Sequence, residues 1–124
     1  MPEFHDLAEL SLNQNGESWG NLGYWQSAED YSEACRSLAQ LLGERAGLDQ
    51  QSIVFDAGFG CGDQLLLWSE QFRVARIHGI NLSHSQTRHA RKLLAKNPDI
   101  DACTNIVQGD IDDPGLWTVL LPDR

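Results

Sequence analysis

A glycine-rich segment near the middle of the chain carries the residue types of a ligand-binding loop. The preceding run, 52–56, is β-branched and aromatic and predicts a buried strand, and residues 58–62 then read Gly-Phe-Gly-Cys-Gly. Gly58 and Gly60 can adopt backbone angles that are closed to other residues, and they allow a ligand to approach the main chain. A helix predicted from Asp63 would add free N–H groups that bind a carboxylate or a phosphate.

The spacing of these glycines, and the acid before them, favour one kind of cofactor over another. A dinucleotide-binding loop reads G-x-G-x-x-G, which requires a glycine at the position where this chain has Asp63. Asp56, at the strand end, would repel a pyrophosphate but would suit a ligand that carries an amine or a sulfonium. The loop therefore argues against a nicotinamide-dependent oxidoreductase. From these residues alone, a tight turn without any ligand remains an alternative.

Periodicity predicts the elements that position this loop. Apolar residues at three- and four-residue steps predict a helix over 27–46, with Ser27 as its N-cap and Gly47 after its end. Further strands are predicted over 74–80 and 104–108, and further helices over 2–10, 63–72, 83–96 and from Asp113 onward. Alternating strands and helices predict an α/β fold, the N-terminal part of a doubly wound, Rossmann-like parallel sheet.

The first 26 residues are predicted to form a unit of their own, ahead of a partial ligand-binding domain over 27–124. After the predicted first helix, the segment 11–26 is rich in Asn and Gly and is typical of a loop. It also contains Trp19 and the pair Tyr24-Trp25. Such large apolar side chains must pack against another element or cover a site.

The composition excludes several classes of partner. The chain has 124 residues, with Lys+Arg 9 and Asp+Glu 18, and its net charge is −9. An acidic chain lacks the positive surface that binds nucleic acid or anionic membranes, so the basic residues within 88–96 indicate a solvated helix face. No apolar run is long enough to span a membrane, the N-terminus does not resemble a signal peptide, and the three cysteines form no CxxC pair. We therefore expect a cytoplasmic chain with free thiols, no nucleic-acid partner and no stable membrane insertion.

Other polar clusters lack the spacing of a metal site. His84 and His89 are five residues apart on a predicted helix, so they do not share a face. Asp110, Asp112 and Asp113 fit a loop and a helix cap better than a magnesium site, which usually needs substrate phosphates as well. We expect no metal and name no catalytic residue.

Four segments together resemble motifs of the class I S-adenosylmethionine-dependent methyltransferases: 21–25, 54–62, 79–86 and 107–110. The segment 21–25, Asn-Leu-Gly-Tyr-Trp, is similar to the branch that methylates sterols, tocopherols and other small molecules and includes cyclopropane fatty-acid synthases. The resemblance implies a methyltransferase that uses S-adenosylmethionine and a small-molecule or lipid acceptor.

The resemblance also implies a role for each matching residue around the methionine part of the cofactor. Asp56 would hold the methionine amino group, while the backbone of Gly58 and Gly60 would pass against the methionine and the ribose. Tyr24 and Trp25 would close over the methionyl end, where an aromatic face attracts a sulfonium.

The nucleoside part of the cofactor would meet the ends of the second and third strands. Asn81, where the family usually has Asp or Glu, would hydrogen-bond the ribose hydroxyls, and Leu82 would pack on the adenine. Asp110 would accept from the adenine amino group, with the backbone N–H of Ile111 nearby. The candidate cofactor-binding residues are therefore Tyr24, Trp25, Asp56, Ala57, Gly58, Gly60, Asn81, Leu82, Gln86, Asp110 and Ile111.

The predicted strands cover only part of the family's sheet. The family has seven strands and this sequence supplies three, so we expect the cofactor-binding part without most of the substrate pocket. The first strand would then have an unpaired edge, which is open to self-association or to a partner chain. The alternative to a methyltransferase is a non-catalytic module that acts through this edge.

Overall fold

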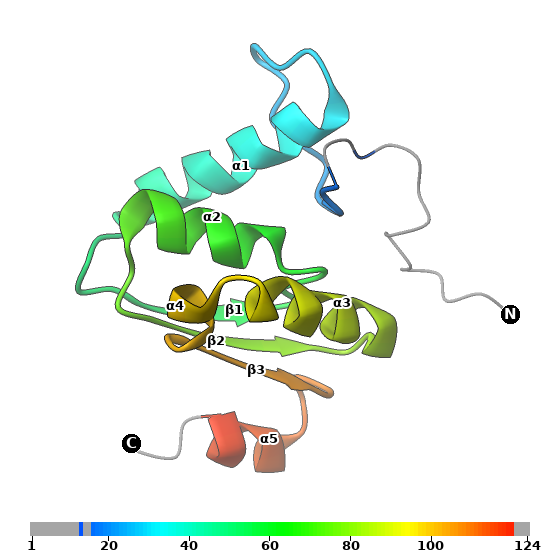
Figure 1. The fold of residues 1–124 in the computed structure, drawn as a ribbon, viewed down its shortest axis with the longest axis vertical. Helices are drawn as coiled ribbons and strands as arrows, with labels where there is room; N and C mark the ends of the chain where they lie inside the picture. Colours follow the sequence, from blue (N-terminus) through cyan, green and yellow to red (C-terminus); the bar gives the residue numbers. More distant parts are fainter. Residues whose placement is uncertain (1–12, 14–15, 121–124) are drawn as a thin grey trace, which may run out of the picture.

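The computed structural model describes residue 13 and residues 16–120 (Figure 1). Along the chain it contains α1 (Tyr31–Ala46), β1 (Ile53–Ala57), α2 (Asp63–Phe72), β2 (Arg76–Asn81), α3 (His84–Ala95), α4 (Pro98–Asp101), β3 (Thr104–Gln108) and α5 (Pro114–Leu120). The predicted alternation of strands and helices is confirmed. The helix predicted over 2–10 lies outside the described residues. No helix within the described part is long and apolar enough to cross a membrane.

The strands form one parallel sheet in the order β1-β2-β3, which confirms the predicted fold class. The register pairs Phe55 with His78 and His78 with Asn105, so all three strands end at the same edge of the sheet. Within the described residues β1 pairs only with β2, so its other edge carries no strand. In a parallel α/β sheet, ligands bind at the carboxyl ends of the strands, and here those ends are adjacent.

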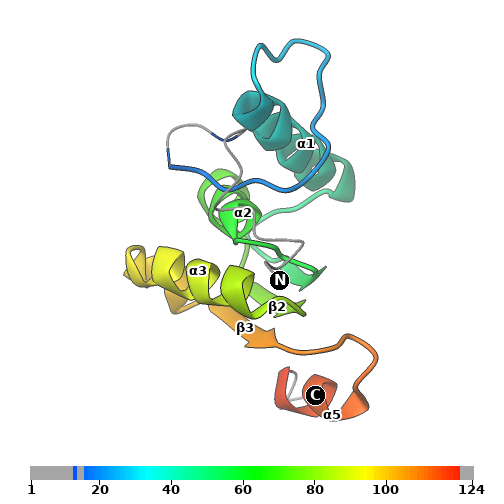
Figure 2. The ribbon, with the colours of Figure 1, turned by 90° about the vertical axis from the view of Figure 1, so that its right-hand side faces the viewer.

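Helices cover both faces of the sheet. In two perpendicular views, α1, α2 and α3 lie on one side and α5 lies on the other (Figures 1 and 2). The main core lies between the sheet and α2 and α3 and consists of Phe59, Leu65, Val74, Ile77, Ala90, Leu94 and Ile106. On the other face Phe55 stacks on Trp117 of α5, with ring centroids 4.5 Å apart.

The prediction that β1 is fully buried is wrong. Ile53 is 70% exposed and Phe55 is 36% exposed. Their strand lies at the edge of the sheet, and on that face the ring of Trp117 covers Phe55 from one side. The apolar run therefore identified a strand correctly but overestimated how much of it is covered.

The predicted boundaries differ from the structure at three places. The first long helix begins at Tyr31 rather than near Ser27, because Asp30 is its N-cap. The strand β2 begins at Arg76 rather than at 74. The pair Asn97-Pro98 not only ends α3 but begins the short helix α4, in which Pro98 occupies the first turn.

Replacing Asp30 tests the corrected N-cap. The Asp30 carboxylate accepts from the Glu33 N–H at 2.8 Å, so Asp30→Ala should lower the free energy of unfolding by about 1 kcal/mol. Ser27→Ala is the matched control and should leave it unchanged, because Ser27 lies outside the helix. Urea denaturation of both variants measures the difference, and a larger loss for Ser27→Ala would contradict the assignment.

Candidate functional site

Main-chain hydrogen bonds join the segments that follow β1 and β3 to the end of β2. The Gly58 N–H donates to the carbonyl of Ile80 at 2.7 Å, and the Gly109 N–H donates to the carbonyl of Asn81 at 2.9 Å. Residues from the ends of β1, β2 and β3 are thus fixed relative to one another at the edge where a ligand is expected.

The glycine loop has a backbone that requires glycine but leaves space above it. Gly58 has a φ of 86° and Gly60 a φ of 64°, in the left-handed region that side chains disfavour. A Cβ at either position would have no atom within 4 Å, so both face open space. Phe59 between them is fully buried in the core. The loop therefore presents its main chain outward and is anchored by a ring pointing inward.

Asn81 links this loop to the start of α3. Its side chain is buried, and its Oδ1 accepts from the Gly60 N–H at 3.2 Å. Its Nδ2 donates to Oε1 of Gln86 at 3.1 Å. Ser83, the N-cap of α3, accepts from the Gln86 N–H, as the capping pattern predicted. Asn81 thus holds the loop in place in addition to any contact that it makes with a ligand.

Asp56 is the acidic group of the site. It is half-buried at the end of β1, and its Oδ2 accepts from the Gln64 side chain of α2 at 3.1 Å. Burial raises the pKa of Asp56 to about 6, and the hydrogen bond from Gln64 acts in the opposite direction. Burial disfavours the ionised form of this carboxyl group, and a cationic ligand group beside it would stabilise that form.

Two cavities adjoin at this edge and between them receive most of the predicted residues. The larger, of about 510 Å³, is lined by Asp56, Gly58, Gly60, Asn81, Leu82 and Gln86 among others. The smaller, of about 270 Å³, is lined by Ala57, Gly58, Ile80, Asn81, Leu82, Gly109, Asp110 and Ile111. Gly58, Asn81 and Leu82 belong to both, so an elongated ligand could occupy the two cavities together.

The predicted aromatic pair does not line either cavity. The Tyr24 N–H donates to the carbonyl of Ala34 at 2.8 Å, and the Trp25 indole donates to the carbonyl of Leu22 at 3.0 Å. Tyr24 is thus bonded to α1 and Trp25 to its own loop, and Trp25 is 51% exposed. The expectation that Tyr24 and Trp25 close over a cofactor finds no support in this arrangement.

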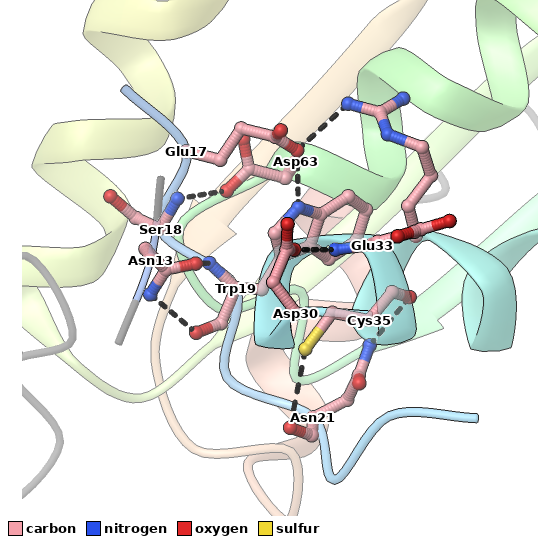
Figure 3. Close-up of polar contacts among 10 residues, drawn as sticks. Asn13, Glu17, Ser18, Trp19, Asn21, Asp30, Glu33, Cys35 and Asp63 are labelled. Atoms are coloured by element: carbon pink, nitrogen blue, oxygen red, sulfur yellow. Dashed lines mark hydrogen bonds and ion pairs between the residues drawn. The ribbon is translucent and has the colours of Figure 1, made fainter. Parts of the chain in front are cut away.

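An earlier part of the same loop lines the larger cavity instead: Ser18, Trp19, Gly20 and Asn21. The Ser18 N–H donates to Asp63 at the start of α2 at 2.9 Å, and the main chain of Trp19 exchanges two hydrogen bonds with the side chain of Asn13 (Figure 3). The sequence predicted that the large apolar side chains of this loop pack against an element or cover a site, and the resemblance assigned the covering role to Tyr24 and Trp25 rather than to Trp19.

The helices α1 and α2 supply a further wall that sequence reasoning missed: Leu38, Ala39, Leu42, Gln64 and Trp68. Leu38 and Leu42 are among the apolar residues at three- and four-residue steps that predicted the helix α1. In the structure Ala39 is buried, whereas Leu42 is 53% exposed at the cavity. The apolar residues of α1 therefore cover a wider face than the part of α1 that packs against α2.

Comparison with known proteins relates this site to a family. No family model matches the chain. An erythromycin 3''-O-methyltransferase of Saccharopolyspora erythraea is 42% identical over 71 residues, which is 56% of this chain and 23% of that protein. A methyltransferase structure from Thiobacillus denitrificans, with bound S-adenosyl-L-homocysteine, is 26% identical with a TM-score of 0.51; it matches 60% of this chain and 29% of that one. The chain is thus similar in sequence and in fold to part of S-adenosylmethionine-dependent methyltransferases.

Not every methyltransferase-like structure is named for methyl transfer. The structure of the cyclase SpnF has a TM-score of 0.62 and 26% identity, and the match covers 71% of this chain and 33% of SpnF. The chain spans a third or less of the length of each of these relatives.

Proposed function

We propose that the chain binds S-adenosylmethionine at the carboxyl ends of β1, β2 and β3 and forms part of an enzyme that methylates a small molecule or a lipid. The observation that carries the proposal is the pair of adjoining cavities, with one carboxylate beside an open glycine backbone and a second beyond Asn81. This arrangement offers a carboxylate for an ammonium group and two adjoining cavities for an amino acid joined to a nucleoside.

The residues of the larger cavity would hold the amino-acid end of the cofactor. Asp56 would pair with the ammonium group, and the exposed backbone at Gly58 and Gly60 would contact the chain of the methionine. The bound cofactor supplies an activated methyl group on a sulfonium, so the protein's main task is to align an acceptor with it.

The residues shared with the smaller cavity would hold the nucleoside. The ribose would meet Asn81, whose Oδ1 has a second lone pair beside the one used by Gly60. The adenine would lie against the exposed side chain of Leu82, with Asp110 and Ile111 at its edge. Gln86 would act through its hydrogen bond to Asn81.

Calorimetric titration with S-adenosylhomocysteine tests the proposal directly. We expect micromolar binding by the folded chain, and amide shifts at 58–60, 81–82 and 109–111 in two-dimensional NMR spectra. NADH, which lacks the amino-acid end, is the control ligand and should bind at least about tenfold more weakly. A folded chain that binds neither ligand, or that prefers NADH, would overturn the proposal.

The free edge of β1 supports a second, non-catalytic candidate, in which the chain acts by pairing with itself or with a partner chain. Ile53 on this edge strand is largely exposed, and an unpaired strand edge is a template for another strand. Light scattering of the purified chain separates the two candidates when it is combined with the titration. Stable association without cofactor binding would favour this second candidate.

A further inference from the structure

The larger cavity has two chemically different halves. Around Asp56, Asn81 and Gln86 it is polar, and this half is the proposed position of the methionine and ribose. On the side of α1, α2 and the loop it is mostly apolar, with Trp19, Leu38, Ala39, Leu42 and Trp68 beside Ser18, Gly20, Asn21 and Gln64. The apolar half needs an occupant that the polar parts of the cofactor do not provide.

The indole donors of the two tryptophans in these walls are already used. The indole N–H of Trp68 donates to the carbonyl of Ala39 at 2.9 Å, and the indole N–H of Trp19 donates to Glu17. Both tryptophans therefore contribute carbon surface to this half and no free donor. A polar group placed against the two indoles would lose its water without gaining a hydrogen bond from them, and this loss is unfavourable.

The charges near the cavity also select against an anion. No Lys, Arg or His lines either cavity among the described residues, and the ionisable carboxyls there are Asp56 and Asp110. Arg36 of α1 forms an ion pair with Glu17 at 2.8 Å. A phosphate or carboxylate in the apolar half would thus have no counter-charge and would face Asp56.

We infer that the apolar half, between α1, α2 and residues 18–21, is the subsite for an uncharged, apolar part of the methyl acceptor. The inference rests on the proposed function, because it assigns the polar half of the same cavity to the cofactor. Leu42, which is 53% exposed at the cavity, provides the apolar rim through which such a molecule would enter. Acceptors whose reacting end carries a phosphate are excluded from this subsite.

Two fluorescent probes with the same ring system test the inference. N-phenyl-1-naphthylamine is neutral, and 8-anilinonaphthalene-1-sulfonate adds a sulfonate to the same skeleton. At pH 7.5 we expect the neutral probe to bind about tenfold more tightly, because the anion is desolvated beside a carboxylate. In two-dimensional NMR spectra the neutral probe should shift the amides of 18–21 and 38–42.

Substitutions in the α1 wall provide the matched variants. Leu42→Asp should weaken the binding of the neutral probe about tenfold, and Leu38→Gln should weaken this binding without adding a charge. Val119→Asp, at a 62% exposed position on α5, is the control and should leave probe binding unchanged. Circular dichroism verifies that each variant is folded.

The outcomes separate this inference from the proposed function. Tighter binding of the sulfonate, or probe shifts confined to β1 and α5, would overturn the subsite while S-adenosylhomocysteine still binds. Binding of the neutral probe at α1 by a chain that does not bind S-adenosylhomocysteine would remove the assignment to a methyl acceptor. Binding of both ligands, each with its own set of shifted amides, supports both statements.

Discussion

Asp56→Asn is expected to weaken S-adenosylhomocysteine binding about thirtyfold while it stabilises the free protein. The loss follows because the amide keeps the shape of the carboxylate but cannot pair with the ammonium group of the ligand, and a hydrogen bond to a charged group contributes about 1.5–3 kcal/mol. The gain in stability follows because burial penalises the ionised carboxylate in the folded chain. Calorimetry measures the first effect, and urea denaturation measures the second.

The pH dependence of both effects has a definite sign. Burial raises the pKa of Asp56 from 3.8 to about 6, so the folded chain holds this proton more tightly than the unfolded chain. The stabilisation of the folded chain by protonated Asp56 is therefore fully present below pH 4 and is lost as the pH rises through about 6. Asp56→Asn should therefore stabilise the chain on the order of 1 kcal/mol at pH 7.5, and this gain should vanish by pH 4.

The affinity for the ligand should rise with pH, whereas the stability contributed by Asp56 falls with pH. The carboxylate form binds the ammonium group, so wild-type affinity should rise as the pH increases through about 6 and then level off. Asp56→Asn should remove this rise. Asp99→Asn, at an exposed position on α4, is the control and should leave affinity and its pH profile unchanged. Wild-type affinity retained in Asp56→Asn would contradict the assignment of this carboxylate.

Phe59→Ala should cause the largest loss of stability of any single substitution in the loop. Phe59 is fully buried and packs with Leu65, Ile77 and Ile106. A Cβ added to Gly79 would lie 2.8 Å from the Phe59 ring, which shows how closely β2 approaches it. Truncating a buried phenylalanine costs about 3–5 kcal/mol, a large part of the total stability of a domain.

The same substitution should loosen the site, because the ring anchors the backbone between Gly58 and Gly60 to the core. Denaturant titration gives the loss of stability, and S-adenosylhomocysteine titration well below the unfolding midpoint gives the loss of affinity. Phe59→Leu retains most of the buried volume and should cost less than half as much. A loss below about 1 kcal/mol for Phe59→Ala would show that the ring does not anchor the loop.

The sequence was sufficient to predict the parallel fold and the glycine loop, because both depend on local patterns. The period of the apolar residues distinguishes strands from helices, and the acid and glycines after 52–55 mark a strand end. The helix start could not be predicted as well, because both Ser27 and Asp30 are good N-caps. The loop before the helix also contacts it, through the hydrogen bond from the Tyr24 N–H to the carbonyl of Ala34. The local sequence around Ser27 does not specify this contact.

The walls of the larger cavity were harder to predict than its floor. The floor, Asp56 and the glycine loop, is contiguous in sequence, whereas the walls come from residues 18–21, α1 and α2. Which aromatic residue of the loop faces the cavity depends on long-range anchors, such as the bond between Ser18 and Asp63. Periodicity and composition carry no information about such pairs.

The ring stack on the far side of the sheet has a mechanical consequence for the site. Trp117 stacks on Phe55, the neighbour of Asp56 in β1, and its indole donates to the carbonyl of Ile111 at 2.8 Å. One side chain beneath the sheet thus connects the strand bearing Asp56 to the segment bearing Ile111. A bound cofactor would connect the same two segments from above and complete a closed ring of contacts. In the proposed complex, the indole of Trp117 would therefore help to set the distance between the two segments that hold the ends of the cofactor.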